Sequence, residues 1–175
     1  TSIEYDALGR VTKEWGPNFK GYFYEGVSNY VEKQLVVYAH LLLYSVTNYE
    51  YDAEMRIVKV LESNTETASY TYDANGLLLS ATNCDGVKVT YEYYTTREPF
   101  RVKRVRVTGG DIVICDRTYD YRDCLTVVTD NLSGKQLFYH FNDFGNCVSV
   151  NDQLGYACFA KYSDAYPVNH PESIS

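Results

Sequence analysis

Residues that commonly carry catalysis or bind metals are sparse in this 175-residue chain. Its three histidines lie far apart, and its five cysteines include no C-x-x-C pair of the kind found in zinc knuckles and dithiol redox sites. No nucleophile-elbow, zinc-protease, P-loop or dinucleotide-binding motif is present. We therefore expect no catalytic residue, no cofactor and no metal site. A glycosidase remains an open alternative. Its two catalytic carboxylates are recognised by their distance in the folded protein, and they can lie anywhere in the sequence.

Acidic and amide side chains recur at the start of short polar segments, as in Asp73-Ala74-Asn75-Gly76. Calcium-binding loops also use such residues, but the spacing D-x-[DN]-x-[DN]-G does not occur. Turn chemistry explains the pattern better, because an Asp side chain accepts a hydrogen bond from the backbone two residues later and Gly suits the last position. The sequence predicts β-turns here and not metal sites.

Five of the 16 basic residues are concentrated in one short run: Arg97, Arg101, Lys103, Arg104 and Arg106. Two interpretations are open. The run could be a solvated strand face or a charged edge that opposes aggregation. It could instead be a patch for an anionic ligand such as a cell-wall polymer.

Composition narrows the function classes further. The chain has 23 acidic against 16 basic residues, a net charge of −7, which argues against general nucleic-acid binding. Its hydrophobic content of 45% supports a folded protein, and its 19 tyrosines favour strands over helices. No stretch is long enough to span a bilayer as a helix. Because the chain begins at Thr1, we expect it to be a piece of a longer polypeptide whose targeting signal lies elsewhere.

One phrase recurs along the chain: two aromatic residues separated by one residue, then an acidic or amide residue and a turn. The second aromatic residue sets the period, since Tyr51 to Tyr72 and Tyr72 to Tyr93 are both 21 residues. The interval from Tyr93 to Tyr121 is longer, at 28 residues. A fixed period of this length is typical of repeat proteins. The residues assigned to the motif are Tyr5, Asp6, Gly9, Arg10, Tyr49, Tyr51, Asp52, Arg56, Tyr70, Tyr72, Asp73, Gly76, Tyr91, Tyr93, Tyr119, Tyr121, Tyr139, Phe141, Gly145 and Tyr162.

Each repeat has the local chemistry of a β-hairpin. After the turn that Gly76 closes, Leu77 to Thr82 is predicted as a strand, and Val87 to Tyr93 alternates apolar and polar residues as a half-buried strand does. The segment Leu35 to Val46 is predicted as a pair of buried strands, with a short helix as the alternative. Hairpins joined by short turns pair with their neighbours, so we predict an all-β fold of hairpins of about 21 residues in one long twisted antiparallel sheet.

The motif residues Tyr5-Asp6-x-x-Gly9-Arg10 and Tyr72-Asp73-x-x-Gly76 resemble the YD-repeat, or RHS-repeat, family of bacterial wall-associated and toxin-delivering proteins and of the teneurin shell. The resemblance implies an open fragment of a hollow β-shell that holds a passenger polypeptide. It also implies an extracellular or cell-wall location. No Pro follows an Asp, so the family's self-cleavage is not expected here.

These observations predict a repeat segment of about eight hairpins over residues 1–162 and a linker or tail over 163–175. The expected role is non-enzymatic: a β-sheet wall whose partners are flanking repeats, neighbouring domains or a passenger, with no nucleic acid and no membrane insertion. The alternative is a carbohydrate or cell-wall binding module that uses exposed tyrosines and the basic run at 97–106. The fragment is also expected either to self-associate through open sheet edges or to fold its Pro-containing tail back over the last strand.

Overall fold

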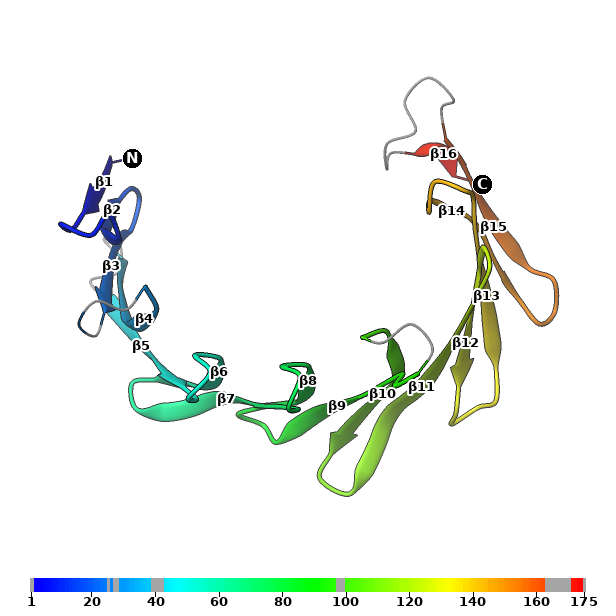
Figure 1. Ribbon diagram of the computed structural model, residues 1–175, viewed down its shortest axis with the longest axis horizontal. Helices are drawn as coiled ribbons and strands as arrows, with labels where there is room; N and C mark the ends of the chain where they lie inside the picture. The colour runs from blue at the N-terminus through cyan, green and yellow to red at the C-terminus, as the bar shows by residue number, and fades with distance from the viewer. Residues whose placement is uncertain are drawn as a thin grey trace. The chain divides into compact units, whose positions relative to one another are not determined.

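The computed structural model describes residues 2–24, 26, 29–38, 43–96, 100–162 and 171–174. The chain divides into two compact units, Thr1–Val87 and Lys88–Ser175. Within the described residues all regular structure is β-strand, which confirms the predicted all-β class (Figure 1). No helix in the described part is long and apolar enough to cross a membrane.

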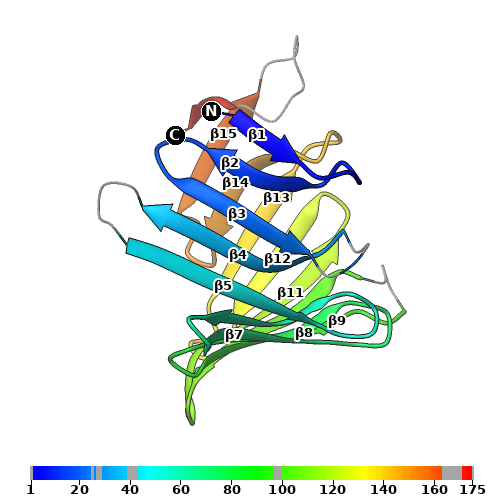
Figure 2. The same cartoon turned by 90° about the vertical axis from the view of Figure 1, so that its left-hand side faces the viewer.

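The first unit is an antiparallel sheet in which each strand pairs with the next one in the chain (Figure 2). Short turns join most of these strands, so each consecutive pair is a hairpin. The eight strands are β1 (Ser2–Tyr5), β2 (Val11–Trp15), β3 (Phe19–Tyr24), β4 (Val31–Tyr38), β5 (Leu43–Tyr51), β6 (Ile57–Glu62), β7 (Thr65–Tyr72) and β8 (Leu78–Asn83).

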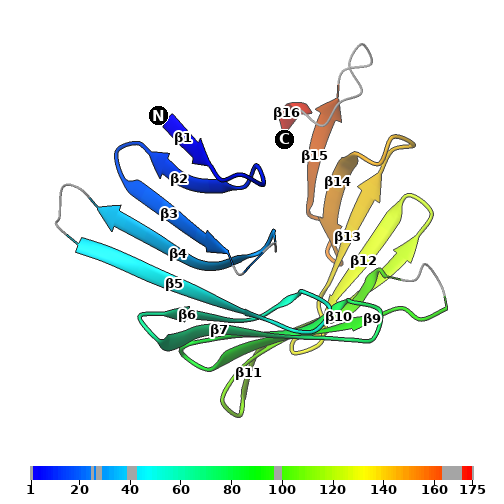
Figure 3. The same ribbon diagram turned by 60° about the vertical axis from the view of Figure 1, so that its left-hand side comes forward.

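The second unit repeats this arrangement. From β10 onward each strand pairs antiparallel with its successor, and β11 to β15 lie side by side in Figure 3. The strands are β9 (Val87–Tyr93), β10 (Val102–Gly109), β11 (Ile112–Arg122), β12 (Leu125–Asp130), β13 (Gln136–Phe141), β14 (Cys147–Asp152), β15 (Ala157–Tyr162) and β16 (Pro171–Ile174). The prediction of repeated antiparallel hairpins is confirmed.

Very few side chains of the described residues are fully buried. Among these residues Val127, at 4% exposure, is the single buried hydrophobic side chain, whereas Tyr44 and Leu154 are 72% and 81% exposed. A strand in such a sheet gains stability from the strands on either side of it, as expected for a protein built from stacked repeats.

Individual strand predictions can be compared with these bounds. The predicted strand Val87 to Tyr93 coincides with β9, and the predicted strand Leu77 to Thr82 corresponds to β8. Residues 35–38 lie in β4 and 43–46 in β5, and β4 pairs with β5, so the described part of Leu35 to Val46 is a strand pair and not a helix. The prediction that these strands are buried is wrong, because Tyr44 is 72% exposed and most of the other described side chains of the segment are only half-buried. Residues 39–42 of that segment lie outside the described residues.

The described part of the C-terminal segment is not a plain linker, because it folds back on the last strand of the repeats, which is one of the two predicted alternatives. Pro171–Ile174 forms β16, which pairs antiparallel with β15 and brings Ala160 opposite Ile174. The physical reason is that the backbone N–H and C=O groups on the outer side of β15 would otherwise lack a strand partner. Residues 163–170 and 175 of the predicted tail lie outside the described residues.

Candidate functional site: the Tyr-Asp turns

The Tyr-Asp turn is a compact hydrogen-bonded loop that begins at the aspartate. At Asp73, the side-chain Oδ1 accepts hydrogen bonds from the N–H groups of Asn75 (2.9 Å) and Leu77 (2.8 Å). The N–H of Gly76 donates to the carbonyl oxygen of Asp73 at 3.1 Å. Gly76 has a φ of +84°, in the left-handed region that glycine adopts without steric cost. The prediction that Asp starts the turn and Gly ends it is confirmed here.

The same geometry recurs with other residues at the key positions. Asp6 and Asp52 make the corresponding bonds, and Asn142 does so with its amide oxygen. The turn from Asn83 to Gly86 also uses an amide oxygen, which accepts from the N–H groups of Asp85 and Val87. The turn therefore requires an acceptor oxygen at its first position and not a negative charge.

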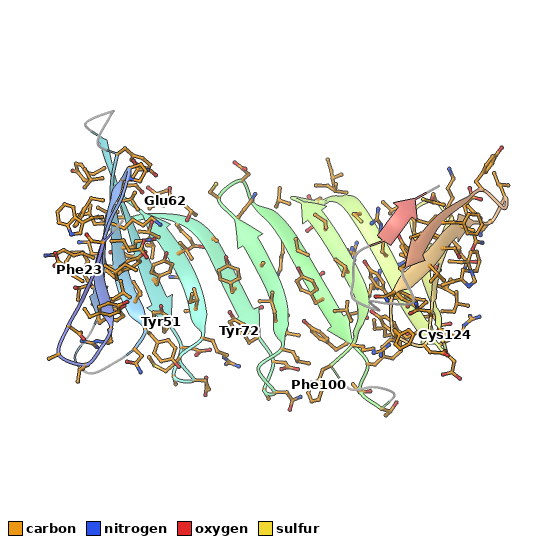
Figure 4. All side chains as sticks on the ribbon, turned by 90° about the horizontal axis from the view of Figure 1, so that it is seen from above. Phe23, Tyr51, Glu62, Tyr72, Phe100 and Cys124 are labelled. Atoms are coloured by element: carbon orange, nitrogen blue, oxygen red, sulfur yellow. The ribbon has the colours of Figure 1, made fainter. Side chains whose placement is uncertain are left out.

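An arginine at the end of the turn joins one repeat to the next. The Nε of Arg56 donates to Oδ2 of Asp52 at 2.7 Å, and its Nη1 donates to the carbonyl oxygen of Asp73 at 3.2 Å. The guanidinium carbon lies 4.8 Å from the centre of the Tyr72 ring, which is cation–π geometry. In return, the Tyr72 hydroxyl donates to the carbonyl oxygen of Ile57 at 2.8 Å. Figure 4 shows Tyr51 and Tyr72 near the hairpin turns that follow their strands. We call this arrangement the arginine link.

A second arginine link lies at the start of the chain. Arg10 donates from Nε to Oδ2 of Asp6 at 2.6 Å, and its guanidinium carbon lies 4.5 Å from the centre of the Tyr24 ring. The Tyr24 hydroxyl donates to the carbonyl oxygen of Val11 at 2.8 Å. The two links use the same atoms in the same roles, so the motif residues Tyr, Asp and Arg act together across consecutive repeats.

These contacts also set the protonation of the turn aspartates. Partial burial by itself would raise the pKa of Asp52, but hydrogen bonds from the backbone and guanidinium of Arg56 outweigh it, and the pKa lies below its ordinary value. The pKa of Asp6 is lowered in the same way by Arg10. Both aspartates are therefore anionic at neutral pH, which keeps the ion pairs intact.

The structure adds a third linking arginine that the sequence pattern does not reveal. Phe100 occupies the position of the turn glycine, with a φ of +82°, and Arg101 follows it. The N–H of Tyr94 donates to the carbonyl oxygen of Arg101 at 3.0 Å, as the N–H of Asp52 does to that of Arg56. The guanidinium carbon of Arg101 lies 4.9 Å from the centre of the Tyr121 ring. Tyr94 stands at the position of the turn aspartate, and the turn from Tyr94 to Arg101 is longer than that from Asp52 to Arg56, so neither residue type nor local spacing reveals this copy of the motif.

Arg104, another member of the basic run, belongs to a separate charged cluster. It donates from Nε to Oδ1 of Asp116 at 2.8 Å and from Nη2 to Oδ2 at 2.5 Å, a bidentate ion pair. Asp116 is buried and also accepts a hydrogen bond from Nδ2 of Asn131 at 2.7 Å. These hydrogen bonds, that of Arg104 above all, lower the pKa of Asp116 to about 2, and the ion pair raises the pKa of Arg104.

The described members of the basic run, Arg101, Lys103, Arg104 and Arg106, do not form one continuous surface. Arg106 contacts the Asp116 cluster at 3.9 Å, on the same face of β10 as Arg104. Lys103 has the opposite parity along the strand, and Arg101 stacks on Tyr121. Arg97 lies outside the described residues.

The remaining motif residues occupy equivalent places in successive strands. Because side chains alternate along a strand, the two aromatic residues of the copies that end β5, β7, β9, β11 and β13 lie on one face of their strand. The aromatic motif residues fall at or near the ends of β1, β5, β7, β9, β11, β13 and β15: Tyr5, Tyr49, Tyr51, Tyr70, Tyr72, Tyr91, Tyr93, Tyr119, Tyr121, Tyr139, Phe141 and Tyr162. Gly9 and Gly145 occupy the left-handed turn position, with φ of +77° and +80°.

The described histidine and cysteine residues do not gather into a catalytic or metal-binding cluster. His140 lies in β13, where Nε2 is 2.9 Å from Oδ1 of Asn151. The five cysteines are free thiols. In the part of the chain that the structure describes, no three His, Cys, Asp or Glu residues gather as metal ligands would. His40 and His170 lie outside the described residues.

Comparison with known families identifies one segment. Residues 72–97 match the family model described as RHS Repeat. The matched segment begins at Tyr72 and includes the turn of Asp73 and Gly76, β8 and β9. This match confirms the resemblance to the YD/RHS-repeat family and supports a structural repeat protein. A comparison with curated proteins gives no match.

Proposed function

We propose that this chain, which contains an RHS repeat, is a non-enzymatic segment of a large secreted or cell-surface protein. Its consecutive hairpins build a β-sheet wall that holds neighbouring domains or a passenger polypeptide. The observation that carries the proposal is the arginine link. In this link the most distinctive residues of the motif, Arg56 and Tyr72, contact each other's repeats and so join one repeat to the next.

The exposure of the sheet supports the same role. Large apolar side chains remain accessible on described strands, including Trp15 (47%) and Phe159 (55%). A wall that is completed by flanking repeats and a passenger accounts for such exposure.

Limited proteolysis of the longer parent protein tests this role. In the unaltered protein, the polypeptide that adjoins the repeats should resist cleavage under conditions that digest the same polypeptide when it is made alone. Arg56→Ala combined with Tyr72→Ala should weaken the wall and shorten the time to cleavage. Equal cleavage rates for the adjoining polypeptide alone and in the parent protein would contradict the proposal.

A second candidate function rests on an aromatic hollow in the first unit. A cavity of about 490 Å³ is lined by four tyrosines, Tyr22, Tyr30, Tyr49 and Tyr51, together with the amides Asn29 and Gln34. Aromatic rings with neighbouring amides suit a sugar, whose C–H face stacks on rings and whose hydroxyls bond to amides. This arrangement supports the alternative of a carbohydrate-binding module.

A glycan array separates the two functions. Saturable binding that Tyr30→Ala abolishes would favour the carbohydrate module. Tyr44→Ala is the matched control, because Tyr44 is more exposed and does not line the hollow. Absence of any glycan ligand would leave the wall as the supported role.

A further inference from the structure

A hollow in the second unit is lined by both apolar and charged side chains, and the arginine links between repeats do not account for them. It measures about 390 Å³ and lies where the turn after β12 and the turn after β14 project from the sheet. Its volume is in the range of sites that bind small organic molecules.

The floor of this hollow is apolar. Val128 of β12 lies directly opposite Leu137 of β13, and Leu137 lies opposite Asp152 of β14, so these side chains share one face of the sheet. Tyr139 is two residues beyond Leu137 on that face. Leu154, at the tip of the next turn, is 81% exposed and lines the hollow from the side.

Two cations line the same hollow. Arg117 of β11 lies opposite Asp130 of β12, and Lys135 ends the turn that Asp130 begins. Among the described residues, neither the Arg117 guanidinium nor the Lys135 ammonium makes a hydrogen bond or a close ion pair, although the charge of Arg117 contributes to lowering the pKa of the nearby Asp130 carboxyl. Arg104, by contrast, is engaged by both Asp116 and Glu92. Arg117 and Lys135 thus retain donors for a ligand.

The two acidic residues of the hollow are used by their own turns. Asp130 accepts from the N–H of Leu132 and the hydroxyl of Ser133. Asp152 accepts from the N–H groups of Leu154 and Tyr156 through Oδ1. Their negative charge still faces the hollow and disfavours a ligand with several negative charges.

We propose that this hollow binds a small organic anion with one carboxylate and an apolar body. The carboxylate is held by Arg117 and Lys135, and the apolar part packs on Leu137, Tyr139 and Leu154. Arg offers paired N–H donors that match a carboxylate, and the apolar floor supplies area that a simple inorganic ion would not use. This inference is independent of the proposed wall role.

Titration of the intact chain with 3-phenylpropionate tests the proposal by calorimetry and by backbone amide NMR shifts. We expect saturable binding with shifts in β12, β13 and the turn at Asp152 to Tyr156. The neutral analogue 3-phenylpropanamide should bind at least about tenfold more weakly, because it lacks the charge. Equal binding of both compounds, or no shift in these segments, would overturn the proposal.

Substitutions of Arg117 and Lys135 test whether these two side chains bind the carboxylate. Arg117→Gln and Lys135→Gln should each weaken binding of 3-phenylpropionate by about fivefold to tenfold. The matched control is Lys88→Gln, which removes the same charge from an exposed residue of β9 outside the hollow. Melting curves verify folding of each variant. Equal affinity of the control and the two pocket variants would show that the cations do not hold the ligand.

The anion could be free or carried by a peptide. An acetylated and amidated Glu-Phe dipeptide and its Gln-Phe counterpart separate these sources. Tighter binding of the Glu-Phe dipeptide than of 3-phenylpropionate would assign the hollow to an acidic peptide segment. The reverse order would assign it to a free carboxylate. Both results support an anion site, and binding of neither carboxylate would exclude it.

Discussion

The guanidinium of Arg56 lies over the ring of Tyr72 at 4.8 Å, and the hydroxyl of Tyr72 donates to the carbonyl oxygen of Ile57, the residue after Arg56. In the first contact a side chain of one repeat reaches the next repeat, and in the second a side chain of the next repeat reaches back to the first. Removing either side chain therefore removes part of what holds the next hairpin in register.

Tyr72→Phe isolates the hydroxyl of this relationship. The substitution keeps the ring under Arg56 and leaves the carbonyl oxygen of Ile57 without that donor, so we expect a loss of about 0.5–1.5 kcal/mol in the free energy of unfolding. Urea denaturation measures it. Tyr5→Phe is the matched control, because Tyr5 is 60% exposed and its hydroxyl makes no hydrogen bond within the described residues. Equal effects of the two substitutions would contradict a linking role.

Met55→Gly should stabilise the protein. Met55 has a φ of +63° in the turn position that Gly9 and Gly76 occupy elsewhere, and a side chain there is strained. We expect a gain of about 0.5–1 kcal/mol, since the relief of strain is partly offset by the greater chain entropy of glycine when unfolded. The melting temperature should rise. The reverse change, Gly76→Val, should lower it, since Gly76 has a φ of +84°.

Asp73→Ala should cost about 0.5–2 kcal/mol, by analogy with other side-chain caps. It removes the oxygen that accepts from Asn75 and Leu77. Asp73→Asn is the matched control and should cost much less, because Asn142 supports the same turn with an amide oxygen. Thermal melts of the two variants measure the difference. An Asn variant as unstable as the Ala variant would show that charge, and not the acceptor geometry, is required.

Asp116 should make stability depend on acid. Its pKa is about 2 in the folded chain, below its ordinary value of 3.8, chiefly because of the hydrogen bond from Arg104. A lowered pKa stabilises the folded chain at pH values above the unfolded pKa, and that stabilisation is lost as the pH falls from about 4 to about 2. Asp116→Asn should be less stable at neutral pH and should lose less stability over this interval. Urea unfolding at both pH values measures it; an unchanged pH dependence in the variant would contradict the assignment.

Removal of residues 163–175 should promote self-association. β16 pairs with the outer side of β15, and its loss would expose backbone groups beside Phe159, which is 55% exposed. Light scattering of the truncated chain should show larger species than the intact chain. Phe159→Lys in the truncated chain should reduce them, because a charge on an edge strand opposes pairing. A strictly monomeric truncated chain would contradict this prediction.

Much of the local structure is predictable from the residues, because it depends on neighbours in the chain. The 21-residue period locates the hairpins, and strict alternation from Val87 to Tyr93 matches β9. The turn of Asp73 and Gly76 follows from a side-chain acceptor and a residue tolerant of positive φ. The aromatic residues of the motif share a strand face for the same local reason.

The partners of those residues depend on strand register, which no single repeat contains. Tertiary structure alone decides that Arg56 reaches Tyr72, because a bulge between Glu50 and Tyr51 and the pairing of β6 with β7 set that approach. It also decides that Arg104 is held by Asp116 while Arg101 takes the linking role, since the latter needs Phe100 in a left-handed turn that its residue type does not favour. The hollow beside Arg117 exists only because two turns 22 residues apart, at Asp130 and Asp152, project from neighbouring hairpins of the same sheet.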